Sequence, residues 1–334
     1  MSLAQLDLNP MTRRRSLRWV RALVAAGAFL AAAVVVSPSA AAASELRVYT
    51  TVPGGYTVQP TSTNDHPVVR DLGARITVPA GTTKYLSSKL VVSQATVVTE
   101  TSHLIYCTQG ASTTLVDRLV SGQNVLANTS TTILTRGMIK APSTGDLTCA
   151  LKAIFIDHSG SPDPESIRVD SSTYIEDVFG VLAASAQTYQ SSRTRVDTSY
   201  YAATVTFTAP AGVTSIQAIG DVNVTTCYGS SPESLCVGGR TIGGYAYVGT
   251  QLVVSQLNAN GSVCATTTNG ALAGVTVTNT VHHFKINTWH TSVPVSTACS
   301  SRNFQASTRV TANSGAESIL IESNHQSLTA LFVP

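Results

Sequence analysis

The heptapeptide Glu165-Ser-Ile-Arg-Val-Asp-Ser171 returns near the end of the chain as Glu317-Ser-Ile-Leu-Ile-Glu-Ser323. In both places an apolar stretch follows shortly afterwards, Val178-Phe179 in the first case and Leu331-Phe332 in the second. Short runs rich in β-branched residues between small polar ones are typical of β-strands. We call such a pair of repeated segments a sequence echo. This one predicts a structural unit that occurs twice.

Two further segments recur in the same order as this echo. Val78-Pro-Ala-Gly81 is answered by Ala209-Pro-Ala-Gly212, and Leu90-Val-Val-Ser-Gln94 is answered by Leu252-Val-Val-Ser-Gln256. An ordered series of matches at similar spacing indicates an internal duplication. The alternative is that a chain rich in Val, Ser and Thr repeats short strand sequences by chance.

The N-terminus has the features of an export signal. Five arginines from Arg13 to Arg21 precede the uncharged apolar run 22–36, and Pro38 and a series of alanines follow it. Because the run is shorter than the roughly 20 residues of a membrane-spanning helix, we expect a cleaved signal peptide, residues 1–43, rather than an uncleaved anchor. Residues 12–18 also resemble the twin-arginine motif, so both export routes stay open. We expect a secreted, extracellular protein.

The positive net charge of the sequence belongs to this leader. The chain has 21 Lys and Arg against 18 Asp and Glu, and the leader holds five of the former and one of the latter. The remaining chain is nearly neutral, which argues against nucleic acid and anionic membranes as partners and against membrane insertion of the mature chain. With 43% apolar and 12% charged residues, the composition is that of a folded extracellular β-protein.

Short β-branched runs separated by Gly, Pro, Asn and Ser dominate the mature chain. Residues 204–208 alternate strictly, so that Val205 and Phe207 share one face of a strand. This rhythm predicts an all-β protein of two tandem antiparallel β-sandwich domains, jelly-roll or Ig-like, that arose by duplication. We expect a first domain at 44–181 with a loop-rich N-terminal extension, a polar connector at 182–201, and a second domain at 202–334.

Six cysteines in an exported chain are expected to form disulfides. The duplication favours Cys107–Cys149 and Cys264–Cys299 as bridges in the same position of each domain, and it leaves Cys227–Cys236 to close a short loop. This loop contains Tyr228 and lies in an insertion of the second domain, where it is either a binding surface or a brace. A metal site at the cysteines is not indicated, because the sequence has no CxxC motif.

One acidic stretch is the candidate metal site. Asp157, Asp163 and Glu165, with two serines between them, supply oxygen atoms at alternate positions, as a calcium-binding loop would. The second copy keeps the Ser314-Gly315 turn and Glu317, but it lacks counterparts of Asp157 and Asp163. We therefore expect no obligatory cofactor, and Ca²⁺ at these three residues is the open alternative to a solvated turn.

Trp289 is the one tryptophan outside the leader, and His283, Lys285 and His290 lie within a few residues of it. An aromatic ring can stack on the apolar face of a sugar while polar neighbours bind its hydroxyls. The alternative places Trp289 in the core, where tryptophan is more often found. The candidate glycan-binding residues are Trp289, His290, His283, Lys285 and Tyr228.

No stretch of the sequence requires a particular reaction, since GxSxG, HExxH, SxxK and Gly-rich phosphate-loop motifs are absent. The neighbours Glu176 and Asp177 would point to opposite faces of a strand and could not act as a pair. The sequence predicts a non-catalytic secreted protein that binds glycans or cell-envelope surfaces, or that forms part of an extracellular structure by self-assembly. The alternatives are a secreted hydrolase directed at glycans or esters, and an inhibitor or toxin acting through the Cys227–Cys236 loop.

Overall fold

In the computed structural model, the regular secondary structure of the described part of the chain is almost entirely β-strand. The predicted all-β class is confirmed, and the one helical element in the described ranges is the 3-10 turn η1 (Ser234–Cys236). No helix in these ranges has the length and apolarity needed to cross a bilayer. The predicted signal peptide, 1–43, lies outside the described residues. The described ranges are 46–51, 56–58, 68–157, 165–178, 182–188, 192–227, 234–240, 244–269, 273–313, 316–322 and 327–333.

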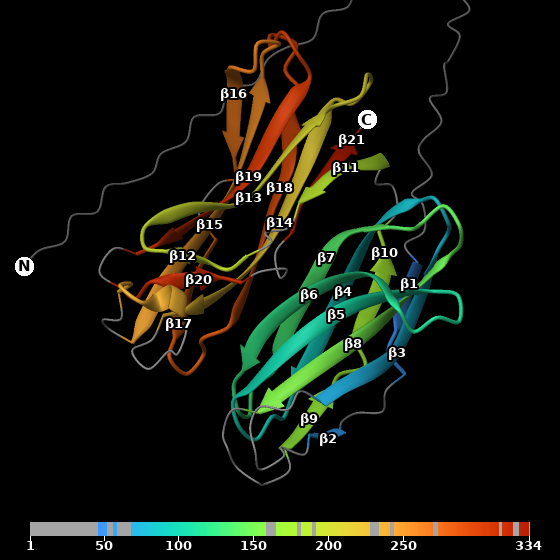
Figure 1. Cartoon of the computed structure of the whole chain (residues 1–334), viewed down its shortest axis with the longest axis vertical. Helices are drawn as coiled ribbons and strands as arrows, with labels where there is room; N and C mark the ends of the chain where they lie inside the picture. The colour runs from blue at the N-terminus through green and yellow to red at the C-terminus, as the bar shows by residue number, and fades with distance from the viewer. Residues whose placement is uncertain are drawn as a thin grey trace, which may run out of the picture. The chain divides into compact units, whose positions relative to one another are not determined.

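Within the described residues, β1 to β10 form the first half and β11 to β21 form the second (Figure 1). The first half contains β1 (Leu46–Tyr49), β2 (Tyr56–Val58), β3 (Val68–Val78), β4 (Thr83–Ser93), β5 (Thr99–Gln109), β6 (Leu115–Val125), β7 (Thr131–Lys140), β8 (Leu147–Asp157), β9 (Glu165–Val169) and β10 (Tyr174–Asp177). The second half contains β11 (Leu182–Thr188), β12 (Thr194–Val196), β13 (Ser199–Thr208), β14 (Ser215–Thr226), β15 (Tyr245–Leu257), β16 (Val263–Thr268), β17 (Ala273–Thr278), β18 (Phe284–Pro294), β19 (Asn303–Ala312), β20 (Ile319–Ile321) and β21 (Ser327–Val333).

The first half is a jelly roll. Its six-stranded sheet has the order β1-β10-β4-β9-β2, with β7 on the other edge of β4, and its four-stranded sheet has the order β3-β8-β5-β6. Every pair of neighbours is antiparallel, and the chain passes repeatedly between the two sheets, as in a jelly roll. Strand β3 illustrates the local cause, because Leu72, Ala74, Ile76 and Val78 are buried and the residues between them are exposed.

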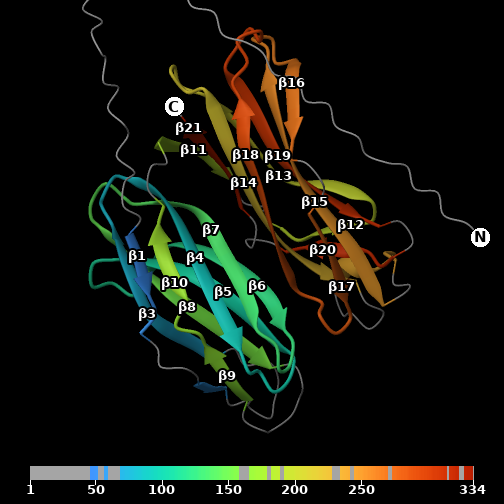
Figure 2. The same ribbon diagram turned by 180° about the vertical axis from the view of Figure 1, so that it is seen from behind.

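The second half repeats this topology strand for strand. Its six-stranded sheet has the order β11-β21-β14-β20-β12 with β18 beside β14, and its five-stranded sheet joins β13-β19-β15 with β16 and β17, which share the place that β6 has in the first half. Figure 2 shows the same two-sheet arrangement in both halves from behind. The equal strand order supports the predicted duplication.

Two of the three sequence echoes fall on corresponding elements. The Glu-Ser-Ile segments form β9 and β20, which both pair with the end of the equivalent strands β4 and β14. The Pro-Ala-Gly segments form the turns between β3 and β4 and between β13 and β14. In both turns the third residue, Gly81 or Gly212, has a positive φ, and an N–H two residues after the alanine donates to the proline carbonyl at 3.3 Å. Glycine is favoured there because it adopts this conformation without steric cost.

The prediction that the third pair of repeated segments occupies corresponding elements is wrong. Leu90–Gln94 begins in β4, whereas Leu252–Gln256 lies in β15, the counterpart of β5. Both segments are central strands whose leucine is fully buried, so the same alternation of apolar and polar residues suits either position. The match therefore reflects a common environment and not a common place in the fold.

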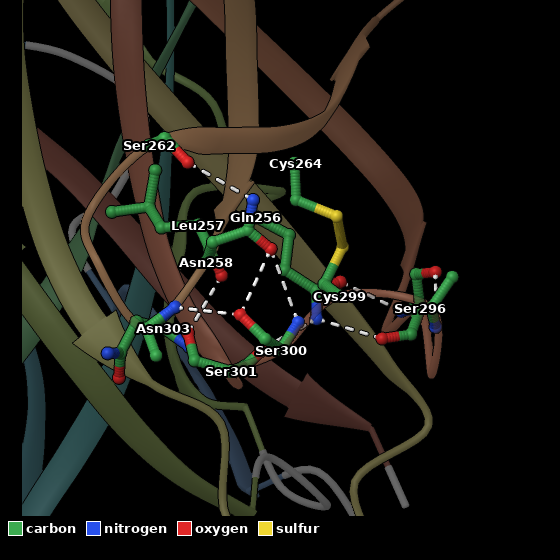
Figure 3. The surroundings of a disulfide bond; sticks show 12 residues. Gln256, Leu257, Asn258, Ser262, Cys264, Ser296, Cys299, Ser300, Ser301 and Asn303 are labelled. Carbon is green, nitrogen blue, oxygen red and sulfur yellow. Dashed lines mark hydrogen bonds between the residues drawn. A yellow bond between two sulfur atoms is a disulfide. The ribbon is translucent and has the colours of Figure 1, made fainter.

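All three predicted disulfide pairings are confirmed. Cys107 and Cys149 lie directly opposite each other on the paired strands β5 and β8. Cys264 is on β16, and Cys299 is in the loop before β19, next to a side-chain network centred on Gln256 (Figure 3). The prediction that these two bridges hold the same position in each half is wrong, because they join non-equivalent elements.

The range predicted as a polar connector, 182–201, contains β11, β12 and the start of β13. Strands β11 and β12 pair with β21 and β20 of the second half. They are the counterparts of β1 and β2, which lie in the predicted N-terminal extension of the first domain. The two ranges are thus equivalent parts of the two halves, and the exact domain boundaries remain a prediction.

Candidate functional site

The side chain of Trp289 lies on the outward face of β18. Ile286 and Thr288 on the same strand are buried in the second half, so Lys285, Asn287 and Trp289 point to the opposite side. Burial decreases along this row, from Lys285, which is 6% exposed, to Trp289, which is 52% exposed. The core position considered for Trp289 is therefore wrong, and its ring is available to a ligand.

A fixed guanidinium group supports the ring of Trp289. Arg136 on β7 places its Cζ atom 5.8 Å from the centroid of the tryptophan ring, within the range of a cation–π contact. The Nε of Arg136 donates to Asp221 Oδ2 at 3.2 Å, and its Nη2 donates to the other carboxylate oxygen of Asp221. Asn287 Nδ2 also donates to this carboxylate, at 2.9 Å. We call Trp289, Arg136, Asp221 and Asn287 the tryptophan ledge.

The buried charged groups behind the ledge shift one another's pKa values. Burial disfavours the ionised carboxyl of Asp221, but Arg136 and Lys285 outweigh that effect and hold its pKa below the ordinary value. Burial lowers the pKa of Lys285 to about 8, and Asp221 offsets part of this shift. Burial also raises the pKa of Tyr85, whose hydroxyl has no hydrogen-bond partner in the described part of the chain. The ledge thus stands on a buried group of charges in which the carboxylate of Asp221 interacts with two cations, Arg136 and Lys285.

The two predicted histidines do not join the ledge. His290 follows Trp289 on the strand and faces the other way; it is partly buried, and this burial lowers its pKa. His283 precedes β18, with Nε2 3.5 Å from Glu100 Oε2 and Nδ1 3.9 Å from Glu322 Oε1. The structure therefore brings Lys285 and Trp289 into one row and places His283 in a separate cluster with two carboxylates.

The remaining predicted site residues are not tested by the structure. Tyr228 and Asp163 lie outside the described residues, as do the side chains of Asp157 and Glu165. Among the residues that are described, no group of three or more His, Cys, Asp or Glu side chains is placed to hold a metal ion. Calcium binding at 157–165 stays a prediction.

Sequence reasoning missed Arg136, Asp221, Glu100 and Glu322. Arg136 and Asp221 are 85 residues apart in the chain, so no local motif links them. The one available signal was that each is the only charge in a short run of otherwise uncharged residues, Thr-Ile-Leu-Thr-Arg-Gly-Met and Ile-Gly-Asp-Val-Asn. A lone buried charge requires a partner, and the partner is known only once the fold is known.

A shallow pocket of about 170 Å³ on the four-stranded sheet is a weaker candidate. Its charges already have partners, because Arg75 pairs with Asp71 and Lys152 Nζ lies 4.3 Å from the centre of the Tyr106 ring. Its volume is also below the roughly 300 Å³ at which small-molecule sites begin.

No protein-family model matches the chain, and no curated protein matches it by sequence. Among solved structures it is similar to the peptide-N(4)-(N-acetyl-beta-D-glucosaminyl) asparagine amidase, at 8% identity and a TM-score of 0.34, over 87% of this chain and 97% of that one. It is also similar to the VP2 subviral particle protein of infectious bursal disease virus, at 11% identity and a TM-score of 0.26, over 86% and 76% of the two chains. For the tandem CBM22-1-CBM22-2 domain of Paenibacillus barcinonensis Xyn10C the identity is 9% and the TM-score 0.25, over 86% and 97%. At such scores the function of this chain rests on its own residues.

Proposed function

We propose that this protein is a secreted, non-catalytic protein that binds glycans of an extracellular or cell-envelope surface. The observation that supports the proposal is the tryptophan ledge, in which a half-exposed indole lies beside a guanidinium group that is fixed by Asp221, and the carboxylate of Asp221 is held in turn by Asn287. A ring with one apolar face open to solvent suits the axial C–H groups of a sugar, and the adjoining amide and guanidinium groups suit its hydroxyls. Such pre-organisation lowers the entropy lost on binding.

The predicted export signal and the disulfides agree with this role. Disulfides persist in oxidising compartments, and all six cysteines of the chain are paired. Few charges and many hydroxyl side chains give the protein a nearly neutral surface. Binding of a neutral glycan to such a surface does not depend on ionic attraction.

The test is co-sedimentation of the mature protein with insoluble polysaccharides, including cellulose, chitin and xylan, with and without EDTA. We expect Trp289→Ala to weaken binding at least about tenfold, equal to about 1.4 kcal/mol. Tyr49→Ala removes another aromatic ring of similar exposure, 50%, and is the matched control, which we expect to bind normally. Unchanged binding by Trp289→Ala would contradict the proposal, and loss of binding in EDTA would instead favour the calcium alternative.

The cluster around His283 favours a second candidate function, that of a secreted hydrolase. Its two ring nitrogens face Glu100 of the first half and Glu322 of the second, and a pair of carboxylates is what general acid and base catalysis of glycoside hydrolysis needs. Release of reducing sugar or of a chromogenic ester product by the mature protein, abolished in Glu100→Gln and in Glu322→Gln but not in Trp289→Ala, would establish this alternative.

A further inference from the structure

The outward face of the five-stranded sheet in the second half carries a row of exposed tyrosines. On β15, Tyr245 and Tyr247 are 44% and 45% exposed, and Ala246 and Val248 between and beyond them are buried in the core. On β13, Tyr201 is 53% exposed. Tyr201 lies opposite Arg309 of β19, and Arg309 lies opposite Gln251 of β15, so the three side chains adjoin across three strands. We call Tyr201, Arg309, Gln251, Tyr245 and Tyr247 the tyrosine face.

The ring of Tyr247 rests on the sheet itself. A Cβ atom at Gly274 on the neighbouring strand β17 would collide with this ring, so the tyrosine covers the glycine. Gly274 is paired with Gly249, so no side chain competes with the ring at this pair of positions. The ring is therefore held against the sheet on one side and half exposed on the other, which is the placement a sugar-stacking residue needs.

The tyrosine face carries a single charge. Among all residues of β13, β15, β16, β17 and β19, the one charged side chain is that of Arg309. In the described part of the chain Arg309 forms no ion pair, and its buried Nε has no hydrogen-bond partner. A guanidinium group in a sheet without any carboxylate is complementary to a planar anion, which it can bind with two parallel hydrogen bonds.

We propose that the tyrosine face is a second binding site, distinct from the tryptophan ledge, for a polysaccharide that carries carboxylate groups. In this assignment Tyr201 and Tyr247 stack on sugar rings, Arg309 pairs with a uronate carboxylate, and Gln251 binds hydroxyls. Tyr201 lies two strands from β15, at the position of Gln251, and Gln251 is four residues from Tyr247 along β15. From the usual spacing of strands and rise per residue, Tyr201 and Tyr247 are roughly 16 Å apart, so the ligand is an extended chain. Nucleic acid does not fit, because a polyphosphate needs many cations and the face has one.

The experiment measures affinity of the mature protein for polygalacturonate and for the same polymer with its carboxyl groups methyl-esterified. We expect esterification and Arg309→Gln each to weaken binding at least about tenfold. Arg309→Lys keeps the charge without the planar fork and should lie between wild type and Arg309→Gln. Tyr201→Ala and Tyr247→Ala should each lose between about twofold and tenfold, and Tyr49→Ala, the matched aromatic control, should lose nothing.

The outcomes separate this inference from the proposed function. Loss of polygalacturonate binding in Arg309→Gln but not in Trp289→Ala, with an unchanged thermal midpoint, supports a separate site on the tyrosine face. Equal binding of the free and esterified polymers, or wild-type binding by Arg309→Gln, overturns the inference. Failure of the wild type to bind polygalacturonate, while Trp289→Ala still abolishes binding to a neutral polysaccharide, also overturns it and leaves the tryptophan ledge intact.

Discussion

Protonation of His103 should destabilise the first half of the molecule in mild acid. The imidazole is fully buried on β5, with Nε2 3.2 Å from Ser88 Oγ and Nδ1 3.2 Å from Thr135 Oγ1. Burial lowers its pKa from 6.5 to about 3. Between pH 6.5 and pH 3, His103 is therefore protonated in the unfolded chain and neutral in the folded chain. The contribution of His103 to the free energy of unfolding is fully present above pH 6.5. Below pH 6.5 it falls by about 1.4 kcal/mol per pH unit, to a total loss of about 5 kcal/mol near pH 3.

Urea unfolding at a series of pH values from 7.5 to 4 checks this prediction. Carboxylates also titrate in this range, so the informative quantity is the difference between wild type and His103→Gln. Glutamine keeps a donor and an acceptor for Ser88 and Thr135 but does not titrate, so the variant should lose less stability on acidification than the wild type. His290→Gln is the comparison variant, because His290 is only partly buried and should contribute a smaller slope. Parallel pH profiles for wild type and His103→Gln would refute the reasoning.

Three further predictions concern the charged group behind the ledge and the disulfide of the second half. Asp221→Ala leaves the buried cations Arg136 and Lys285 without their carboxylate and should cost about 3–5 kcal/mol in urea unfolding; a cost below about 1 kcal/mol would contradict the pairing. Lys285 has a folded-state pKa of about 8 against 10.5 in the unfolded chain, so wild-type stability should rise between these pH values as the unfolded state retains the extra proton. Lys285→Met should lack that rise, and an identical rise in both proteins would exclude Lys285 as its cause. Replacement of Cys264 and Cys299 by serine reopens a loop of 35 residues and should cost up to about 4 kcal/mol, seen as a lower thermal midpoint; an unchanged midpoint would show that the local network already holds the loop.

Local sequence patterns were sufficient for the fold class and for much of the repeat. The Glu-Ser-Ile and Pro-Ala-Gly echoes found corresponding strands and turns, because the buried Ile167 and Ile319, and the positive φ of Gly81 and Gly212, are each specified by a few neighbouring residues. The Leu-Val-Val-Ser-Gln echo failed because any central strand of a sandwich tolerates that alternation. The cysteine pairs were predicted correctly, although the premise that Cys107–Cys149 and Cys264–Cys299 hold the same position in each half was wrong.

The candidate site was predictable only in part. Trp289 and Lys285 share a strand, so period-two alternation is sufficient to place them on one face. Arg136 and Asp221 come from strands in different halves, and their contact depends on how the sheets are stacked, which no window of sequence contains. The tyrosine face had a local signal, the alternating Tyr245-Ala-Tyr247-Val, but Arg309 joins it only through the pairing of β19 with β15.

The Cys107–Cys149 and Cys264–Cys299 bridges join different elements in two halves that share a strand order. The same jelly-roll strand order is thus compatible with a covalent link at either place, so neither position of the link is needed to define that order. Each of these two bridges constrains only the half in which it lies.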